Sequence, residues 1–515
     1  MVRSSWSEAG GSGPLLLSCV VVVLLLVGAG FGVARVDSGV VRTTTVADGV
    51  PIDLVRPADM SAEKAPAVIV AHGYAGSRRL MADWGTTLAR SGFVVALPDF
   101  AGHGANRTPL PEGSARESRL AADLTATVGL LRRTPEVDPD RIGLAGHSMG
   151  AGAVHRFASE HPEIAATVAI SLPGGGDSLQ DPALPKDLLL LTGQYEFPAF
   201  HRAAEDALRA GYPDSVRGSP NGDPALGNAR QGRTVEHAEH ITILFAPRAH
   251  AEAARWLRAS LHGTAAPDGN AAGERVLAAA LLWGAFAVGF LPFVRKLFRP
   301  APPGTARAGA SARIAGAVAA GTVLAVTGSA LVPTGWSPLA VGGEVGWFLA
   351  LFGLGSGLAF ALLAPDSVHR GRGFAPWRSS AVTSYAVLAV AVPIGFGLAE
   401  PIPHGPRWWW TPLVVAGCGI ACAAAELLAR GLHGRRRDGV RAAVLCTALL
   451  GIGAAAVAGV LPSFVLLIAP LLGALLLWHL AWAAVLARSG APWWLPAVVG
   501  GVLLGLPPAA VSPLM

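Results

Sequence analysis

The sequence predicts two parts, an α/β domain with a mainly parallel sheet and an all-α bundle of membrane-spanning helices. Between about Arg35 and Glu274, strand-like and helix-like segments alternate, which is typical of a parallel sheet with helices on both faces. Inside this region Gly146-His147-Ser148-Met149-Gly150 follows a short apolar run and precedes a helix-compatible segment. From Arg275 onward the chain contains apolar runs of roughly 20 residues, the length that crosses a bilayer.

The first element is an apolar run from Pro14 to Ala34, preceded by a short tail that contains Arg3. We expect residues 1–13 to be a cytoplasmic tail and residues 14–34 to be an uncleaved transmembrane anchor, because the run is long for a cleaved signal. The small residues Gly32-Val33-Ala34 leave cleavage by signal peptidase as the alternative.

The α/β domain is expected to cover residues 35–265, followed by a linker at 266–274. Eight strands are predicted, at 40–46, 52–56, 67–71, 93–97, 142–145, 166–170, 187–191 and 241–245. Helices are predicted at 78–90, 116–133, 149–161, 199–210 and 251–261. Residues 211–233, rich in Gly, Pro and Asn, are expected to form an exposed loop.

The polytopic membrane domain is expected to cover residues 275–515 with about eight transmembrane helices. The predicted spans are 276–294, 313–333, 341–364, 380–399, 411–430, 440–460, 464–487 and 492–510. Arg-rich connections at 295–313, 365–379 and 430–441 alternate with connections that carry few charges. Because Arg-rich loops stay in the cytoplasm, we expect the α/β domain on the extracytoplasmic side of the cytoplasmic membrane.

The net charge of +6 is explained by the same Arg-rich connections, which favours anionic lipid over nucleic acid as the partner of the basic residues. All four cysteines lie in apolar runs and the α/β domain contains none, so disulfides give no information on the compartment. Neither a carboxylate and histidine cluster with metal-ligand spacing nor a phosphate-binding Gly-rich loop occurs, and we expect no cofactor and no metal.

Gly146-His147-Ser148-Met149-Gly150 fits the G-x-S-x-G turn that joins a strand to a helix and presents its serine as a nucleophile. The two glycines remove Cβ atoms that would collide with the neighbouring strand and helix. Ser148 would therefore stand clear of the sheet, with the positive end of a helix behind it. Ser148 is the expected nucleophile.

Eight strands with this turn after the fifth resemble the α/β-hydrolase superfamily. His72-Gly73-Tyr74 follows the third predicted strand and is similar to the His-Gly loop of the family. The pair Tyr74 and Met149, together with the turn 146–150, is similar to bacterial polyester hydrolases and dienelactone-hydrolase-like esterases. The resemblance covers the α/β domain and none of the carboxyl-terminal bundle. It implies an oxyanion hole formed by the backbone N–H groups of Tyr74 and Met149.

The chain order of the family, serine then acid then histidine, implies the other two catalytic residues. Glu196 follows the strand predicted at 187–191 and takes the position of the acid. His250 follows the segment predicted as the last strand, 241–245, and takes the position of the base. The alternative acids are Asp177 and Asp181, and the alternative bases are His237 and His240.

The expected function is a membrane-anchored serine hydrolase that cleaves carboxylic esters through an acyl-enzyme, with a Ser-His-Glu triad. Because the connection between 170 and 187 is too short for a large cap, the expected substrate is a bulky or surface-presented ester. A serine peptidase or acyltransferase with the same triad is the first alternative. A transporter or sensor with a ligand-binding hydrolase-like domain is the second, which the scarcity of ionisable residues inside the spans disfavours.

Overall fold

The structure is a computed structural model that describes residues 13–60, 63–174, 183–263, 269–299, 311–332, 336–364, 376–396, 399–400 and 403–515. Its internal contacts divide the chain into two compact units. The globular unit comprises Gly32–Leu277, Gly395–Pro406 and Val511–Met515, and the helical unit comprises Met1–Phe31, Ala278–Ile394 and Arg407–Ala510. Two short segments from the predicted membrane region therefore group with the globular unit, and the domain bounds 35–265 and 275–515 stay predictions.

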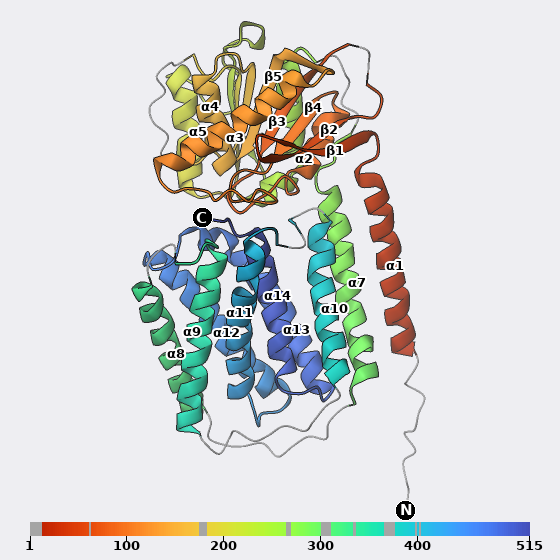
Figure 1. Cartoon of the computed structure of the whole chain (residues 1–515), viewed down its shortest axis with the longest axis vertical. Helices are drawn as coiled ribbons and strands as arrows, with labels where there is room; N and C mark the ends of the chain where they lie inside the picture. Colours follow the sequence, from red (N-terminus) through yellow and green to blue (C-terminus); the bar gives the residue numbers. More distant parts are fainter. Residues whose placement is uncertain are drawn as a thin grey trace, which may run out of the picture. The chain divides into compact units, whose positions relative to one another are not determined.

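The globular unit is built on one eight-stranded sheet with the order β1-β2-β4-β3-β5-β6-β7-β8. Strands β1 to β5 are labelled in Figure 1. Strand β2 runs antiparallel to β1 and β4, and the remaining pairs are parallel. The strands are β1 (Val40–Ala47), β2 (Val50–Pro57), β3 (Ala65–Ala71), β4 (Val94–Pro98), β5 (Val137–His147), β6 (Ala166–Ile170), β7 (Leu188–Gly193) and β8 (Arg230–Val235). The predicted α/β class with a mostly parallel sheet is confirmed.

The last predicted strand is wrong, because residues 241–245 do not enter the sheet. The eighth strand is β8 (Arg230–Val235), which begins inside the region 211–233 predicted as an exposed loop. It is the last strand in the sheet order, paired with β7 and bridged at Arg230 to Asn221, and its polar sequence Arg-Gln-Gly-Arg-Thr-Val lacks the apolar run of a buried strand. The apolar segment Ile241-Thr-Ile-Leu-Phe245 looked more like a strand than the true strand did.

Residues Thr242–Phe245 instead form a 3₁₀-helix. The Glu239 carboxylate accepts hydrogen bonds from the backbone N–H groups of Ile241 at 3.1 Å and Thr242 at 2.7 Å, which favours a turn over an extended chain. Ile243 and Leu244 then point into the core and are fully buried. The apolar character of the segment reflects this burial.

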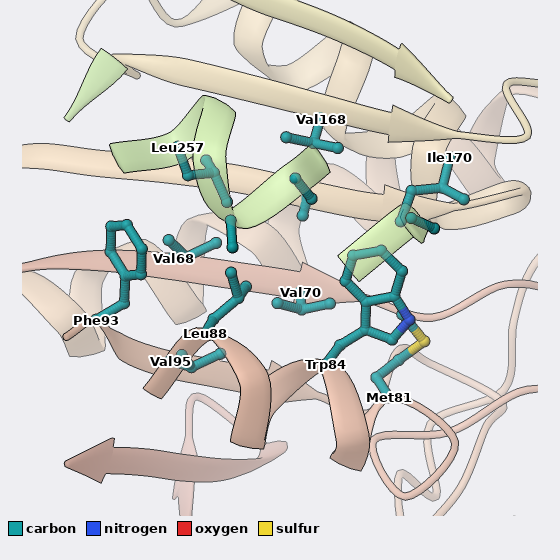
Figure 2. Packing of buried hydrophobic residues seen from close by; sticks show 14 of the residues in the cluster. Val68, Val70, Met81, Trp84, Leu88, Phe93, Val95, Val168, Ile170 and Leu257 are labelled. Atoms are coloured by element: carbon teal, nitrogen blue, oxygen red, sulfur yellow. The ribbon is translucent and has the colours of Figure 1, made fainter. Parts of the chain in front are cut away.

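Helices cover both faces of the sheet, as predicted. They are α2 (Ala82–Arg90), α3 (Ser114–Arg133), α4 (Met149–Glu160), α5 (Pro198–Gly211) and α6 (Pro247–Ser260). One core cluster joins Trp84 and Leu88 of α2 and Leu257 of α6 to strand residues such as Val70 (Figure 2). A second cluster packs α3 and α4 on other sheet residues. Each fully buried large side chain contributes about 1.5–3 kcal/mol, so the sheet is a rigid base for the loops at its edge.

A helix overlaps each predicted span (Figure 1). The helices are α1 (Gly13–Val36), α7 (Glu274–Leu297), α8 (Ser311–Leu331), α9 (Gly342–Leu363), α10 (Pro376–Gly395), α11 (Arg407–Leu428), α12 (Gly434–Val457), α13 (Phe464–Arg488) and α14 (Leu495–Val511). Within the described residues, seven helices are long and apolar enough to cross a membrane: α1, α7, α8, α9, α11, α12 and α13. Helix α14 is apolar but shorter, and helix α10, at the predicted span 380–399, is not among these seven. The seven helices are compatible with a multi-pass membrane protein.

Glu426 is a buried carboxylate of helix α11 in the helical unit. It forms ion pairs with Arg441 at 2.5 Å and with Arg437 at 2.9 Å, both from α12. Arg430 lies over the ring of Trp493 at 5.1 Å from the ring centroid. Contacts between α11 and α12 therefore satisfy Glu426, which fits a structural ion pair.

Candidate active site

Ser148 lies in the turn between β5 and α4, with a strained backbone (φ 53°, ψ −118°) that few L-residues adopt. The flanking glycines explain how the turn forms. A Cβ at Gly146 would lie 2.4 Å from the Gly150 carbonyl oxygen, and a Cβ at Gly150 would lie 2.5 Å from the His72 carbonyl oxygen. Only glycine fits both positions, and the Ser148 side chain is left partly exposed above the sheet edge.

His240, in the segment after β8, lies directly against this serine. Its Nε2 atom is 3.0 Å from the Ser148 hydroxyl oxygen, and its Nδ1 atom is 3.3 Å from a Glu196 carboxylate oxygen. A protonated Nδ1 donates to the carboxylate in this geometry, which leaves Nε2 free to accept the serine proton. Ser148, His240 and Glu196 thus form one hydrogen-bonded chain.

Glu196 is held in place by the turn that follows β7. Its Oε1 atom accepts hydrogen bonds from the Ser171 hydroxyl at 2.5 Å and from the Gly193 backbone N–H at 2.9 Å. Its side chain is fully buried, so the second oxygen, Oε2, is directed at His240 in a site of low dielectric. The Glu196 carboxylate is therefore oriented toward His240.

The His240 ring is fixed by His147 and Phe200. The ring centroids lie 4.8 Å and 4.5 Å from that of His240, and His147 donates from Nε2 to the His240 carbonyl oxygen at 2.8 Å. Burial, with a smaller effect of His240, lowers the pKa of His147 to about 3, so His147 stays neutral and acts as this donor at neutral pH. The second position of the G-x-S-x-G turn therefore positions the histidine.

The expectation that His250 faces Ser148 is wrong. His250 lies inside α6, fully buried, with its Nδ1 atom 2.9 Å from the Thr87 hydroxyl and its Nε2 atom 2.8 Å from the Leu244 carbonyl oxygen. Burial lowers its pKa to about 4, and its ring packs on Trp84 at 4.0 Å between centroids. Both ring nitrogens are used in the core, so His250 is a structural residue.

The error follows from the misplaced eighth strand. Once Arg230–Val235 is the last strand, the next histidines are His237 and His240, the two alternatives weighed for the base. His237 is exposed and His240 is buried against Ser148. The alternative acids, Asp177 and Asp181, lie outside the described residues.

The loop after β3 passes close to Ser148. A Cβ at Gly73 would lie 3.2 Å from the Ser148 Cβ and 2.8 Å from Nδ1 of His147, so only glycine allows this approach. Tyr74 follows directly, and Met149 begins α4 on the other side of the serine. Both residues are partly exposed and belong to the same side of the core. Their backbone N–H groups remain the proposed oxyanion donors.

Comparison with known proteins relates part of this chain to hydrolases. A family model described as serine aminopeptidase, S33, matches residues 62–195, which include Tyr74 and Ser148. An uncharacterized protein of Mycobacterium tuberculosis is 34% identical over 142 residues, which cover 27% of this chain and 47% of that protein. A cutinase of Thermobifida alba is 29% identical over 132 residues, 25% of this chain and 41% of the cutinase. A cutinase of Thermobifida fusca is 31% identical over 107 residues, 20% of this chain and 32% of the cutinase.

The chain thus spans less than half the length of these relatives. The sheet order supports the same assignment independently, because the nucleophile turn follows the fifth strand of an eight-stranded, mostly parallel sheet. The globular unit of this protein belongs to the α/β-hydrolase superfamily.

Proposed function

We propose that this protein is a membrane-anchored serine hydrolase that cleaves carboxylic esters. The observation that carries the proposal is the hydrogen-bonded chain from Ser148 through His240 to Glu196, with 3.0 Å between Ser148 Oγ and His240 Nε2. This distance lies within the range that a general base needs for proton transfer. The strained turn and the buried carboxylate are further features that such a site needs.

The proposed reaction has two halves. The Ser148 oxygen attacks the ester carbonyl carbon while His240 Nε2 takes the serine proton, and the tetrahedral intermediate expels the alcohol, which receives that proton. Water then attacks the acyl-enzyme, gives a proton to His240, and releases the acid when the proton returns to Ser148. Glu196 holds the imidazole in the required tautomer and stabilises its charged form.

The backbone N–H groups of Tyr74 and Met149 are the proposed donors to the negative oxygen of the intermediate. The close approach of Gly73 to Ser148 supports this role, because it brings the following peptide beside the reacting serine. One donor of this kind lowers the barrier by about 3–4 kcal/mol. The helix dipole of α4 favours the same negative charge.

An ester is the favoured substrate for two reasons. The relatives include cutinases, and the aromatic residues on either side of Glu196 in the sequence, Tyr195 and Phe197, are exposed. Exposed aromatic side chains next to a catalytic residue in the sequence suit a bulky or surface-presented substrate. The description of the matched family model, a serine aminopeptidase, favours a peptidase as the alternative.

We test ester against amide specificity with the full-length protein in detergent. A fluorophosphonate probe should label the protein, and a panel of esters should be turned over faster than aminoacyl amides. Faster cleavage of the aminoacyl amides would assign the peptidase, and lack of labelling would refute a serine hydrolase.

Replacing Glu196 with Gln should lower kcat about 10⁴-fold, because the amide holds the wrong tautomer of His240 and leaves its positive charge without a partner. The matched control is Glu236→Gln, which changes an exposed carboxylate in the same segment as His240 that pairs with Arg248 at 3.4 Å. Steady-state ester hydrolysis measures both. Near-wild-type turnover by Glu196→Gln would move the acid to another residue.

We further propose that the α/β domain lies outside the cytoplasm. Arg295 and Lys296 lie in the last turn of helix α7, and Arg299 follows the helix. Arg307 lies outside the described residues. Moving this cluster across a membrane is strongly disfavoured, so the globular unit at the other end of α7 belongs on the opposite face.

A reporter that is active only after export should therefore be active when fused after Gly263 and inactive when fused after Arg307. Reversing the charge of Arg295, Lys296 and Arg299 should weaken this difference, since these residues carry the topological signal. Activity of the Arg307 fusion together with inactivity of the Gly263 fusion would place the hydrolase in the cytoplasm.

A further inference from the structure

The loop that carries Tyr74 is fixed at both ends by two consecutive residues that follow β4. The backbone N–H of Phe100 donates to His72 Nε2 at 3.1 Å, at the start of the loop. The carboxylate of Asp99 accepts a hydrogen bond from the backbone N–H of Arg78 at 2.7 Å, at its end. The position of the proposed oxyanion donor therefore depends on Asp99 and Arg78.

The Arg78 guanidinium is itself the centre of a buried charge cluster. It pairs with Asp99, with Asp53 at 3.0 Å, and with Glu400 at 3.3 Å. Glu400 also pairs with Arg79 at 2.8 Å, and its side chain is only 5% exposed. Burial alone would raise the pKa of Glu400, but the Arg79 and Arg78 guanidinium groups hold it below its ordinary value.

Glu400 belongs to the segment Gly395–Pro406, which the chain supplies from between α10 and α11 and which groups with the globular unit. Gly395 from the same segment accepts a hydrogen bond from Arg79 through its carbonyl oxygen at 3.3 Å. The segment thus contacts Arg78, at the end of the loop that carries Tyr74, and the next residue, Arg79.

A second segment, Val511–Met515, reaches the same region from the end of α14. Leu514 is 2% exposed; its N–H donates to the Gly102 carbonyl at 2.8 Å, and its carbonyl accepts from the Leu110 N–H at 2.8 Å. The next residue, Met515, places its sulfur 3.9 Å from the Tyr74 hydroxyl. The segment therefore covers the loop after β4 and contacts Tyr74 itself.

We propose that Glu400 and Leu514 are positioning residues for hydrolysis, which hold the Tyr74 backbone N–H where the oxyanion forms. The inference rests on the proposed serine-hydrolase function. It gives the carboxyl-terminal region a role beyond anchoring, because both segments lie outside the predicted α/β domain in sequence and complete its site.

The charge balance explains why Glu400 is needed. Asp53 and Asp99 already pair with Arg78, and Glu400 is the carboxylate that pairs with Arg79 in the described part of the chain. When Glu400 loses its charge, the Arg78 and Arg79 guanidinium groups lose the carboxylate that both of them pair with. The site is buried, so water does little to screen the two positive charges. Repulsion between the two guanidinium groups then displaces the end of the Tyr74 loop.

The test uses the full-length protein with four substitutions. Glu400→Gln removes the charge, and its matched control is Glu136→Gln, a half-exposed ion-pair partner of Arg56 just before β5, at the strand end opposite to Ser148. Leu514→Asp places a charge in the buried contact, and its control is Leu226→Asp at an exposed leucine of the same unit.

We expect Glu400→Gln and Leu514→Asp to lower kcat about 10-fold or more, with KM for the ester within about twofold, because the interaction is made in the transition state. Affinity for a trifluoromethyl ketone, which forms a tetrahedral adduct with the serine, should fall in parallel. Hydrogen exchange of the peptide 72–81 should become faster. Both controls should match the wild type, and Glu400→Asp should restore part of kcat.

The proposal would be overturned if Glu400→Gln and Leu514→Asp both matched the wild type in three measurements. These are kcat, affinity for the ketone, and hydrogen exchange of the peptide 72–81. A folded Glu400→Gln that turns over slowly with unchanged exchange at 72–81 would also overturn it, since the loop would not have moved. If the wild type fails to react with the fluorophosphonate, the proposed function fails. Exchange at 72–81 then still decides whether the two residues hold the loop.

Discussion

Replacing Ser148 with alanine should abolish fluorophosphonate labelling and lower kcat for ester hydrolysis by about 10⁶-fold. The serine oxygen is the proposed nucleophile, and the nitrogen proposed to take its proton, His240 Nε2, lies 3.0 Å from it. Alanine occupies the strained turn with no larger side chain than serine, so the fold should be retained.

Ser159→Ala is the matched control, because this hydroxyl lies on the same helix, α4, and donates to the His155 carbonyl oxygen. Active-site labelling on a gel and steady-state ester hydrolysis measure both variants, with thermal unfolding as the test of folding. Persistent labelling of a folded Ser148→Ala protein would assign the nucleophile elsewhere.

Replacing His240 with alanine should lower kcat to a similar degree, about 10⁶-fold, because the serine then lacks its general base. The same substitution at His250 gives the opposite pattern. Its side chain bonds to the Thr87 hydroxyl and the Leu244 carbonyl in the core, so His250→Ala should cost about 2–3 kcal/mol of stability and leave turnover per folded molecule nearly unchanged.

Titration of active sites separates these effects, because it counts the folded, reactive molecules in each preparation. If fully folded His250→Ala loses turnover while His240→Ala keeps its activity, the base is His250, as inferred from the sequence. Denaturant unfolding of both variants measures the stability difference directly.

The turn that carries Ser148 could be predicted because its signal is local. Gly146 and Gly150 flank Ser148 between an apolar run and a helix, and the same two glycines permit backbone contacts below 3 Å in the structure. Glu196 could be placed for the same reason, since it follows a buried strand, β7, through a short turn. In both places neighbouring residues determine the conformation.

The position of His240 beside Ser148 could not be predicted, because the strand before it is stabilised by pairing rather than by its own composition. Strand β8 is polar and lies at the edge of the sheet, while Thr242–Phe245 is apolar and forms a 3₁₀-helix that fills the core. By hydrophobic pattern, β8 is typical of a loop and Thr242–Phe245 of a buried strand. The pairing of β8 with β7 decides between them, and that contact is tertiary.

By itself the sequence determined the α/β class, the apolar spans and the strained serine turn, all of which depend on residues close together in the chain. Only the tertiary structure decided that His240 meets Ser148 and that Gly395–Pro406 and Val511–Met515 group with the globular unit. The physical reason is distance along the chain: the ion pair between Arg78 and Glu400, and the backbone bonds of Leu514 to Gly102, join residues hundreds of positions apart. No local pattern encodes such contacts, because their stability comes from burial and charge pairing that exist only after folding.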